Sequence, residues 1–221
     1  MNAALASNLK PQAAQPIRLY RSALSGHCHR VELFLSLLGL PFTLVDVDLA
    51  KGAHKQPDFL TMNLFGQVPV IQDGEVTLAD SNAILVYLAR RYAADVEQWL
   101  PSDPLAAAHV QRWLSVAAGL LAFGPAVARV IELLKLPANS SDAIARAHGL
   151  FKIMELQLGQ SAFLTGSTPS LADVANYSYV ALAPEGNVSL SDYPQLRAWL
   201  VRIETLPRFL PMVKTPIGLA A

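Results

Sequence analysis

Apolar and polar residues alternate near the start of the chain, and apolar residues then recur at helical spacing. Residues 17–20 (Ile-Arg-Leu-Tyr) alternate, which predicts a strand. Over residues 29–38 apolar side chains return every three or four positions, as on the buried face of a helix, and Gly39-Leu40-Pro41 ends this helix. Residues 42–47 (Phe-Thr-Leu-Val-Asp-Val) predict a second strand.

The next segment carries a hairpin signal. Residues 67–72 and 76–79 are rich in β-forming side chains and flank Asp73-Gly74, a dipeptide that favours a tight turn. A short helix is predicted before the hairpin at residues 57–62, and a longer one after it at residues 81–91. The resulting order, βαβαββα, predicts a mixed sheet with helices on both faces.

The pattern changes after residue 93. Residues 94–104 include two prolines and are predicted to be a linker, and no strand-like run follows. One long helix or two are predicted at 105–135, with a bend near Gly124-Pro125, and further helices at 141–159, 170–182, 194–206 and 207–213. The sequence therefore predicts an N-terminal tail at 1–16, an α/β domain at 17–93 and an all-helical domain at 105–221.

The composition is typical of a protein with a large buried core. Of 221 residues, 52% are hydrophobic and 15% are charged. The 17 Lys and Arg residues balance the 17 Asp and Glu residues, so the chain has no excess of basic charge to attract nucleic acid or an anionic membrane. A neutral, apolar chain also favours an oligomer, because association buries surface.

The single cysteine and the tail indicate the compartment. Cys28 has no second cysteine with which to form an intramolecular disulfide, which is typical of the reducing cytoplasm. The tail contains no apolar run of signal-peptide length, and the apolar stretch at residues 31–40 is interrupted by Glu32 and Ser36. We therefore expect a cytoplasmic protein with no membrane partner.

Three motifs occur in a fixed order along the chain. They are Gln67-Val68-Pro69-Val70, Asp80-Ser81-Asn82-Ala83-Ile84-Leu85 and Ser170-Leu171-Ala172-Asp173-Val174-Ala175. In this order and at about this separation they resemble the cis-proline, acidic-serine and capping-box segments of the glutathione S-transferase family. The resemblance covers residues 17–215 and implies a thioredoxin-like domain that binds glutathione, followed by the helical domain.

The segment before the first helix indicates the class within that family. Ser25-Gly26-His27-Cys28, followed by Arg30-Val31, resembles the serine-type (theta and zeta) classes and their bacterial, cytosolic members. Two positions depart from the common pattern. Leu64 stands where the family often has proline, and Asp80 stands where it commonly has glutamate.

The resemblance implies that the protein is a glutathione transferase of the detoxification type, in which a glutathione thiolate attacks an apolar electrophile. A free thiol has a pKa of about 8.5, and lowering it by about two units requires roughly 2.7 kcal/mol of preferential thiolate stabilisation. Ser25, just before the first helix, is the expected catalytic donor, since the helix dipole also favours an anion there. Local sequence equally allows Ser25 to be only a helix cap, and Ser22 in the same loop is a rival donor.

The resemblance also assigns residues to glutathione itself. Gln67 would bind through its side chain and Val68 through its main chain, with Pro69 as the structural cis-proline, since X-Pro bonds adopt the cis form at modest cost. Asp80 would bind the γ-glutamyl ammonium group, and Ser81 the α-carboxylate.

The glycine carboxylate of glutathione needs a further partner. His54 occupies the position that the resemblance assigns to this contact, and Lys51 and Lys55 are nearby cations that could replace it.

Other polar motifs favour structural roles. Ser170 and Asp173 form a capping box that is expected to serve folding. Ser25-x-x-Cys28 has the spacing of a redox motif whose first thiol is missing, which argues against a two-cysteine cycle, although Cys28 could form a mixed disulfide with glutathione. His27 and His29 flank Cys28, but residues two apart do not face each other on a helix, so no metal site is expected.

The second-substrate pocket is expected beside Ser25 and the first long helices of the second domain, and it should be apolar. Its possible walls, each of which could instead belong to the core or a dimer interface, are Trp113, Leu114, Ala117, Leu121, Phe123 and Arg129. The alternative functions are glutathione-dependent disulfide or peroxide reduction, glutathione-dependent isomerisation or dehalogenation, and glutathione binding without catalysis. The resemblance further implies a homodimer.

Overall fold

The computed structural model describes residues 15–221, so residues 1–14 of the predicted tail lie outside the described part of the chain. An α/β domain comes first, and it contains β1 (Ile17–Arg21), α1 (Gly26–Leu37), β2 (Phe42–Asp46), η1 (Ala53–Lys55), α2 (Pro57–Met62), β3 (Val70–Asp73), β4 (Val76–Ala79) and α3 (Ser81–Tyr92). This order is the predicted βαβαββα arrangement. The Asp73-Gly74 turn joins β3 to β4, as its sequence predicts.

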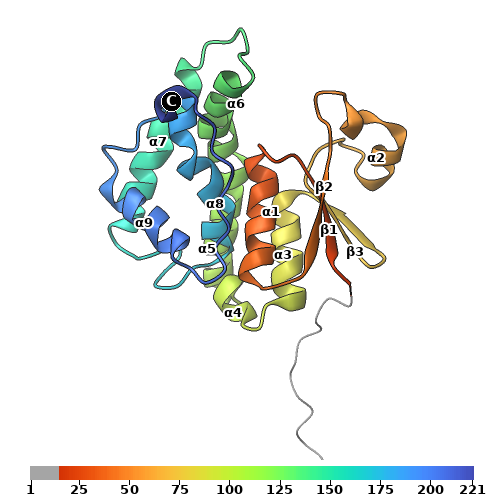
Figure 1. Ribbon diagram of the computed structural model, residues 1–221. Coiled ribbons are helices and arrows are strands. Elements are labelled where there is room, and N and C mark those ends of the chain that lie inside the picture. Colours follow the sequence, from red (N-terminus) through yellow and green to blue (C-terminus); the bar gives the residue numbers. More distant parts are fainter. Residues whose placement is uncertain (1–14) are drawn as a thin grey trace, which may run out of the picture.

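The four strands form one mixed sheet in the order β2-β1-β3-β4. β1 runs parallel to β2 and antiparallel to β3, which in turn pairs antiparallel with β4. Ile17 and Leu19 are fully buried on the face covered by α1 and α3, whereas the Tyr20 ring meets Phe59 of α2 edge-on at 6.5 Å on the opposite face. Figure 1 shows α1 and α3 lying between the sheet and the helical domain.

The helices and turns named for the described part of the second domain include no strand. The domain contains α4 (Val96–Trp99), α5 (Pro104–Ala118), η2 (Ala122–Ala126), α6 (Val127–Leu133), α7 (Ser141–Leu158), α8 (Leu171–Ala181), η3 (Ala183–Gly186), α9 (Pro194–Glu204) and η4 (Gly218–Ala220). Every residue of α8 from Leu171 to Val180 is buried, because α8 packs against α5 on one side and α1 on the other. α8 is therefore the central helix of the molecule.

Two predicted elements differ from the structure, the linker and the last helix. The predicted linker contains the short helix α4, which is capped by Asp95. The segment at 105–135, predicted as one helix or two, contains the two helices α5 and α6 joined through the π-helical segment η2. Pro125 lies inside η2, where a wider turn accommodates a residue that cannot donate a hydrogen bond.

The helix predicted at residues 207–213 is wrong, because this segment forms an irregular strap. Pro211 disfavours helical geometry at Leu210. The carbonyl groups of the strap face α1 instead: Arg208 O accepts from Ser36 Oγ at 2.7 Å, and Leu210 O lies 2.9 Å from His29 Nε2.

Residues Pro104–Leu133 are long and apolar enough to match a membrane span in length and composition, contrary to the expectation from the sequence. In the fold this stretch contains the η2 π-helical segment and packs against α7 and α8. An apolar helix of a protein core passes the same test of length and composition.

Side chains from α1 and α3 of the α/β domain contact the helical domain. His29 Nδ1 on α1 lies 2.8 Å from Ser178 Oγ on α8, and Asn82 Nδ2 on α3 donates to Leu114 O on α5 at 3.0 Å. Gly26 faces the ring of Tyr179 so closely that a Cβ atom at this position would lie 2.7 Å from the ring. These contacts fix the first turns of α1 and α3 relative to α5 and α8.

Candidate functional site

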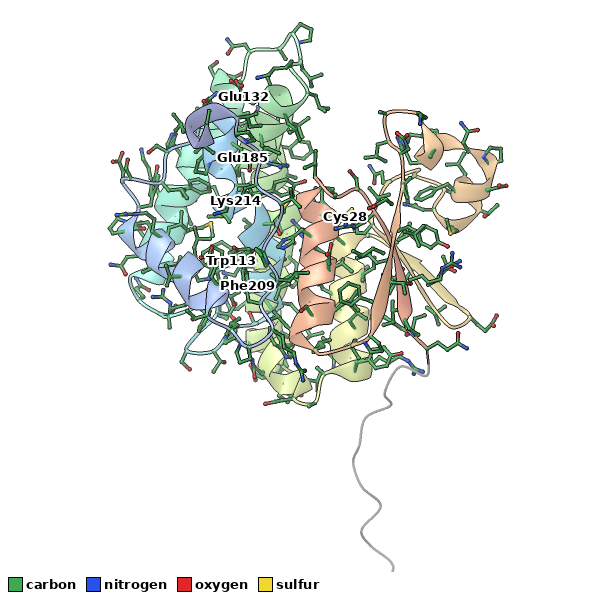
Figure 2. All side chains as sticks on the ribbon, viewed as in Figure 1. Cys28, Trp113, Glu132, Glu185, Phe209 and Lys214 are labelled. Atoms are coloured by element: carbon green, nitrogen blue, oxygen red, sulfur yellow. The ribbon has the colours of Figure 1, made fainter. Side chains whose placement is uncertain are left out.

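A cleft of about 730 Å³ lies where the first turns of α1 and α3 meet the segment that precedes β3. Ala118 and Ala122, at the end of α5 and the start of η2, line its side in the helical domain. Figure 2 marks the α1 end of this region with Cys28. All the ligand and catalytic residues predicted from the sequence, and the predicted cis-proline, line this one cleft: Ser25, His54, Gln67, Val68, Pro69, Asp80 and Ser81.

Ser25 caps the first turn of α1. Its backbone is extended (φ −88°, ψ 118°), and its Oγ accepts a hydrogen bond from the Cys28 N–H at 3.3 Å. A hydroxyl that accepts one bond still has its own proton to donate. The capping role and the predicted donor role of Ser25 are therefore compatible. Among the described residues Ser22 does not line the cleft, and its N–H lies 3.4 Å from Cys28 Sγ.

Cys28 and His27 both lie in the first turn of α1 and both are uncharged. Cys28 is 1% exposed, and burial raises the pKa of its thiol to about 11, so the thiol stays protonated near neutral pH. This state opposes a mixed disulfide at Cys28, which needs a thiolate. Burial, with a smaller effect from the charge of Arg30, lowers the pKa of His27 to about 3, and its ring lines the cleft edge-on to Tyr179.

The segment before β3 presents main chain to the cleft. The Val68–Pro69 peptide bond is cis. Asn63 fixes the segment by donating from Nδ2 to Gln67 O at 2.9 Å, while its Oδ1 accepts from the Phe65 N–H at 3.1 Å. Asn63 also lines the cleft, although it was not among the predicted site residues and is marked in the chain only by its place ahead of the motif.

Asp80 and Ser81 form the start of α3. Asp80 has a positive φ of 70°, a conformation that non-glycine residues adopt mainly where the surrounding structure enforces it and that concentrates at functional sites. Its Oδ1 accepts from the N–H groups of Asn82 (3.0 Å) and Ala83 (2.9 Å). Ser81 is 6% exposed, and its Oγ accepts from Arg30 Nη1 at 3.3 Å. Asp80 is thus the cap, and the N–H of Ser81 remains at the helix terminus.

The three basic residues predicted for the glycine end divide into two groups. His54 and Lys55, in η1, both line the cleft. Lys55 Nζ donates to the carbonyls of Phe65 (3.1 Å) and Gly66 (2.9 Å), so it also holds the segment before β3. Lys51 is 86% exposed and pairs with Asp48 at 3.1 Å, outside the cleft.

None of the six residues named as possible walls of the second-substrate pocket lines the cleft, which agrees with the alternative that they belong to the core or to an interface. Four of them are buried in the core: Trp113, Leu114, Ala117 and Leu121. Arg129 is buried in an ion pair with Glu185 (Nε–Oε2 2.7 Å), and Phe123 is 61% exposed on a groove between α5 and α7. The side of the cleft in the helical domain is formed by Ala118 and Ala122, each one residue after a proposed wall residue. Their side chains are small and leave space for a ligand.

Ser170 and Asp173 are remote from the cleft and form both bonds of a capping box at the start of α8. Asp173 is 1% exposed and accepts from Ser170 N (2.9 Å), Leu164 N (2.9 Å) and Trp199 Nε1 (2.8 Å), while burial raises the pKa of its carboxyl group. Its contacts join α8, α9 and the preceding loop. Within residues 15–221 no group of three or more His, Cys, Asp or Glu side chains is arranged to hold a metal ion.

Comparison with known proteins gives a consistent picture. The family model "Glutathione S-transferase, N-terminal domain" matches residues 24–91, and "Glutathione S-transferase, C-terminal domain" matches residues 138–207. "Glutathione S-transferase 3" of Zea mays is 36% identical, with 88% of this chain and 91% of the relative covered. "Glutathione S-transferase theta-2" of Homo sapiens is 30% identical, with 85% and 80% covered. The crystal structure of a glutathione S-transferase from Pseudomonas fluorescens superposes with a TM-score of 0.83 at 34% identity, with 90% of this chain and all of that chain covered.

Proposed function

The chain belongs to the glutathione S-transferase family and is an enzyme of that type, and we propose that Ser25 is the residue that activates glutathione in it. The observation that carries the proposal is the position of Ser25. Its hydroxyl caps a 12-residue helix and lines the same cleft as the cis Val68–Pro69 segment and the start of α3. A thiolate beside Ser25 would receive an O–H hydrogen bond and the partial positive charge of the α1 N-terminus.

Glutathione would lie across the cleft with its cysteine at its centre. We propose that the Val68 main chain pairs with the cysteinyl backbone, as an added strand would, and that Gln67 contributes its side chain. Asp80 Oδ2, which is not the oxygen engaged in capping, would bind the γ-glutamyl ammonium group. Ser81 would bind the α-carboxylate, and His54, with Lys55 beside it, the glycine carboxylate.

The proposed reaction is nucleophilic attack by glutathione sulfur. Glutathione loses its thiol proton to solvent, and Ser25 stabilises the resulting thiolate. The sulfur then forms a C–S bond to an electrophilic carbon of an apolar substrate held near Ala118 and Ala122, while the leaving group departs with the electron pair of the broken bond. Alignment of the two reactants in one cleft supplies much of the rate enhancement.

Calorimetry with glutathione, combined with the ultraviolet absorbance of the bound thiolate across pH, tests the role of Ser25. We expect Ser25→Ala to bind glutathione while its bound thiol titrates about two pH units higher than in the wild type, the shift that corresponds to roughly 2.7 kcal/mol. Ser22→Ala is the matched control and should titrate like the wild type. If Ser25→Ala and the wild type titrate alike, Ser25 is a helix cap and the activating donor is another group.

We also propose that the enzyme is a cytoplasmic homodimer. Leu64 (88% exposed) and Phe65 (79% exposed) form an apolar tip on the segment before β3. Leu120 after α5, Phe123 in η2, and Ile153 and Leu156 on α7 form an exposed apolar face. A second copy would cover both surfaces. Size-exclusion chromatography should give about twice the chain mass of 23.8 kDa for the wild type and a smaller species for Phe65→Ser. A wild-type protein that elutes at the mass of one chain contradicts the proposal.

A further inference from the structure

Arg30 is a fully buried arginine without a carboxylate partner. It lies on α1, and its side chain is 0% exposed. Nη1 donates to Asn82 Oδ1 at 2.9 Å and to Ser81 Oγ at 3.3 Å, whereas Nε and Nη2 have no hydrogen-bond partner among the described residues. A buried charge is normally paired, because removing it from water is costly.

The other fully buried arginine of the described chain is paired with a carboxylate, as buried charges usually are. Arg129 is 1% exposed and pairs with the Glu185 carboxylate at 2.7 Å. Arg30 instead lines the cleft, close to the starts of both α1 and α3. Burial lowers its pKa to about 10, partly offset by Tyr179, Asp80 and Cys28, so the guanidinium remains charged at neutral pH. The cleft therefore has in its wall a positive charge that Asp80 offsets only through space and that no carboxylate of the described chain contacts directly.

The contacts of Arg30 indicate which end of the cleft would bind an anion. Ser81 Oγ accepts from Arg30, so the Ser81 hydroxyl proton is free to donate toward the cleft. Asp80 Oδ1 accepts hydrogen bonds from the N–H groups of Asn82 and Ala83. The N–H of Ser81 is not capped by Asp80 and lies at the N-terminus of the 12-residue helix α3. Two donors and the helix dipole thus converge where the proposed function places the γ-glutamyl carboxylate.

We propose that Arg30 is a positioning residue for the γ-glutamyl end of glutathione, fixing the Ser81 hydroxyl and the Asn82 amide while supplying the counter-charge for the bound α-carboxylate. This inference rests on the proposed function. Asn82 connects this γ-glutamyl subsite to the helical domain, because its Nδ2 donates to Leu114 O on α5. The end of α5 lines the cleft at Ala118.

The test compares two ligands by calorimetry on the full chain. One is glutathione, and the other is 4-aminobutyryl-cysteinyl-glycine, which lacks only the α-carboxylate. The wild type should prefer glutathione, and Arg30→Gln should reduce that preference by about tenfold or more, as expected for a lost interaction with a charged group. The pKa of the bound thiol should stay at its wild-type value, because Arg30 acts on the other end of the ligand. Arg30→Lys keeps the charge without the forked donor and should give an intermediate preference.

Arg129→Gln is the matched control, since it also removes a fully buried guanidinium. It should lower thermal stability but leave the ratio of the two affinities unchanged. If Arg30→Gln does not fold, the ratio measured for Arg30→Lys decides the question. The inference is overturned if a folded Arg30 variant has the same ratio of the two ligand affinities as the wild type. It is also overturned if only the pKa of the bound thiol changes, because the charge of Arg30 would then act on the sulfur. A wild type that binds neither ligand instead refutes the proposed function.

Discussion

The Arg129–Glu185 pair allows the cost of an unpaired buried charge to be measured. The two side chains are 1% and 2% exposed, and Arg129 Nε donates to Glu185 Oε2 at 2.7 Å. Glu185 also accepts from Thr215 N at 2.8 Å and Thr215 Oγ1 at 2.6 Å, while Arg129 Nη1 donates to Leu24 O at 2.7 Å. Glu185→Gln keeps the shape of the side chain and leaves the guanidinium without its counter-charge.

Breaking a buried pair by removing one partner typically costs about 3–5 kcal/mol. For a chain of 150–250 residues each kcal/mol lowers the melting temperature by about 2–4 °C, so Glu185→Gln should melt about 6–20 °C below the wild type. Thermal and urea unfolding, followed by circular dichroism, measure this difference. Lys135→Gln is the control, because it removes an exposed partner of Glu132 at 3.8 Å and should cost less than about 1 kcal/mol.

A double variant, Arg129→Met with Glu185→Leu, separates the charge effect from the packing effect. Because both charges are absent, it should recover a large part of the stability that Glu185→Gln loses. If Glu185→Gln costs no more than Lys135→Gln, the pair does not behave as a desolvated ion pair, and the reasoning is wrong.

Three further results are expected. Gly26→Ala should cost about 1–3 kcal/mol, because its new Cβ would lie within 2.9 Å of three ring carbons of Tyr179, and Tyr179→Leu should restore part of this loss in a urea titration. Burial lowers the pKa of His29 to about 4, so the unfolded chain binds more protons between pH 6.5 and 4, and His29 alone should lower stability by about 3 kcal/mol as pH drops through that window. His29→Asn should remove this share of the dependence and leave the share that comes from His27, and a slope that does not change would contradict the assignment. Asp173→Ala should cost about 2–4 kcal/mol through the lost cap and its buried donors, such as Trp199 Nε1, while the glutathione affinity of the folded fraction stays at its wild-type value.

The sequence predicted those features that depend on local pattern. The spacing of Val31, Phe34 and Leu35 identified the buried face of α1, and all three are fully buried. Asp73-Gly74 identified the hairpin, because this dipeptide suits the backbone of a tight turn. The motif residues that line the cleft were assigned by the resemblance to the glutathione S-transferase family and not by local pattern.

Features that depend on packing between distant helices could not be predicted in this way. Ala117 and Ala118 are neighbours in sequence, yet Ala117 is buried and Ala118 lines the cleft, because the rotation of α5 is set by α8. Arg30 in a helix suggests a solvent-exposed charge until α1 is placed against α3. The strap at residues 207–213 has enough apolar residues for a helix, but its partners on α1 are more than 170 residues away in sequence.

The contacts of α1 and α3 with the helical domain have a consequence for protein engineering. A chimera that joins this α/β domain to the helical domain of another transferase would retain Ser25, Asp80 and Ser81 in its sequence. The positions of these three site residues would still depend on which residues of the new domain contact Gly26, His29 and Asn82. Exchanging helical domains to change the electrophile thus also changes the support of the glutathione subsite, unless these three contacts are transferred together with the new domain.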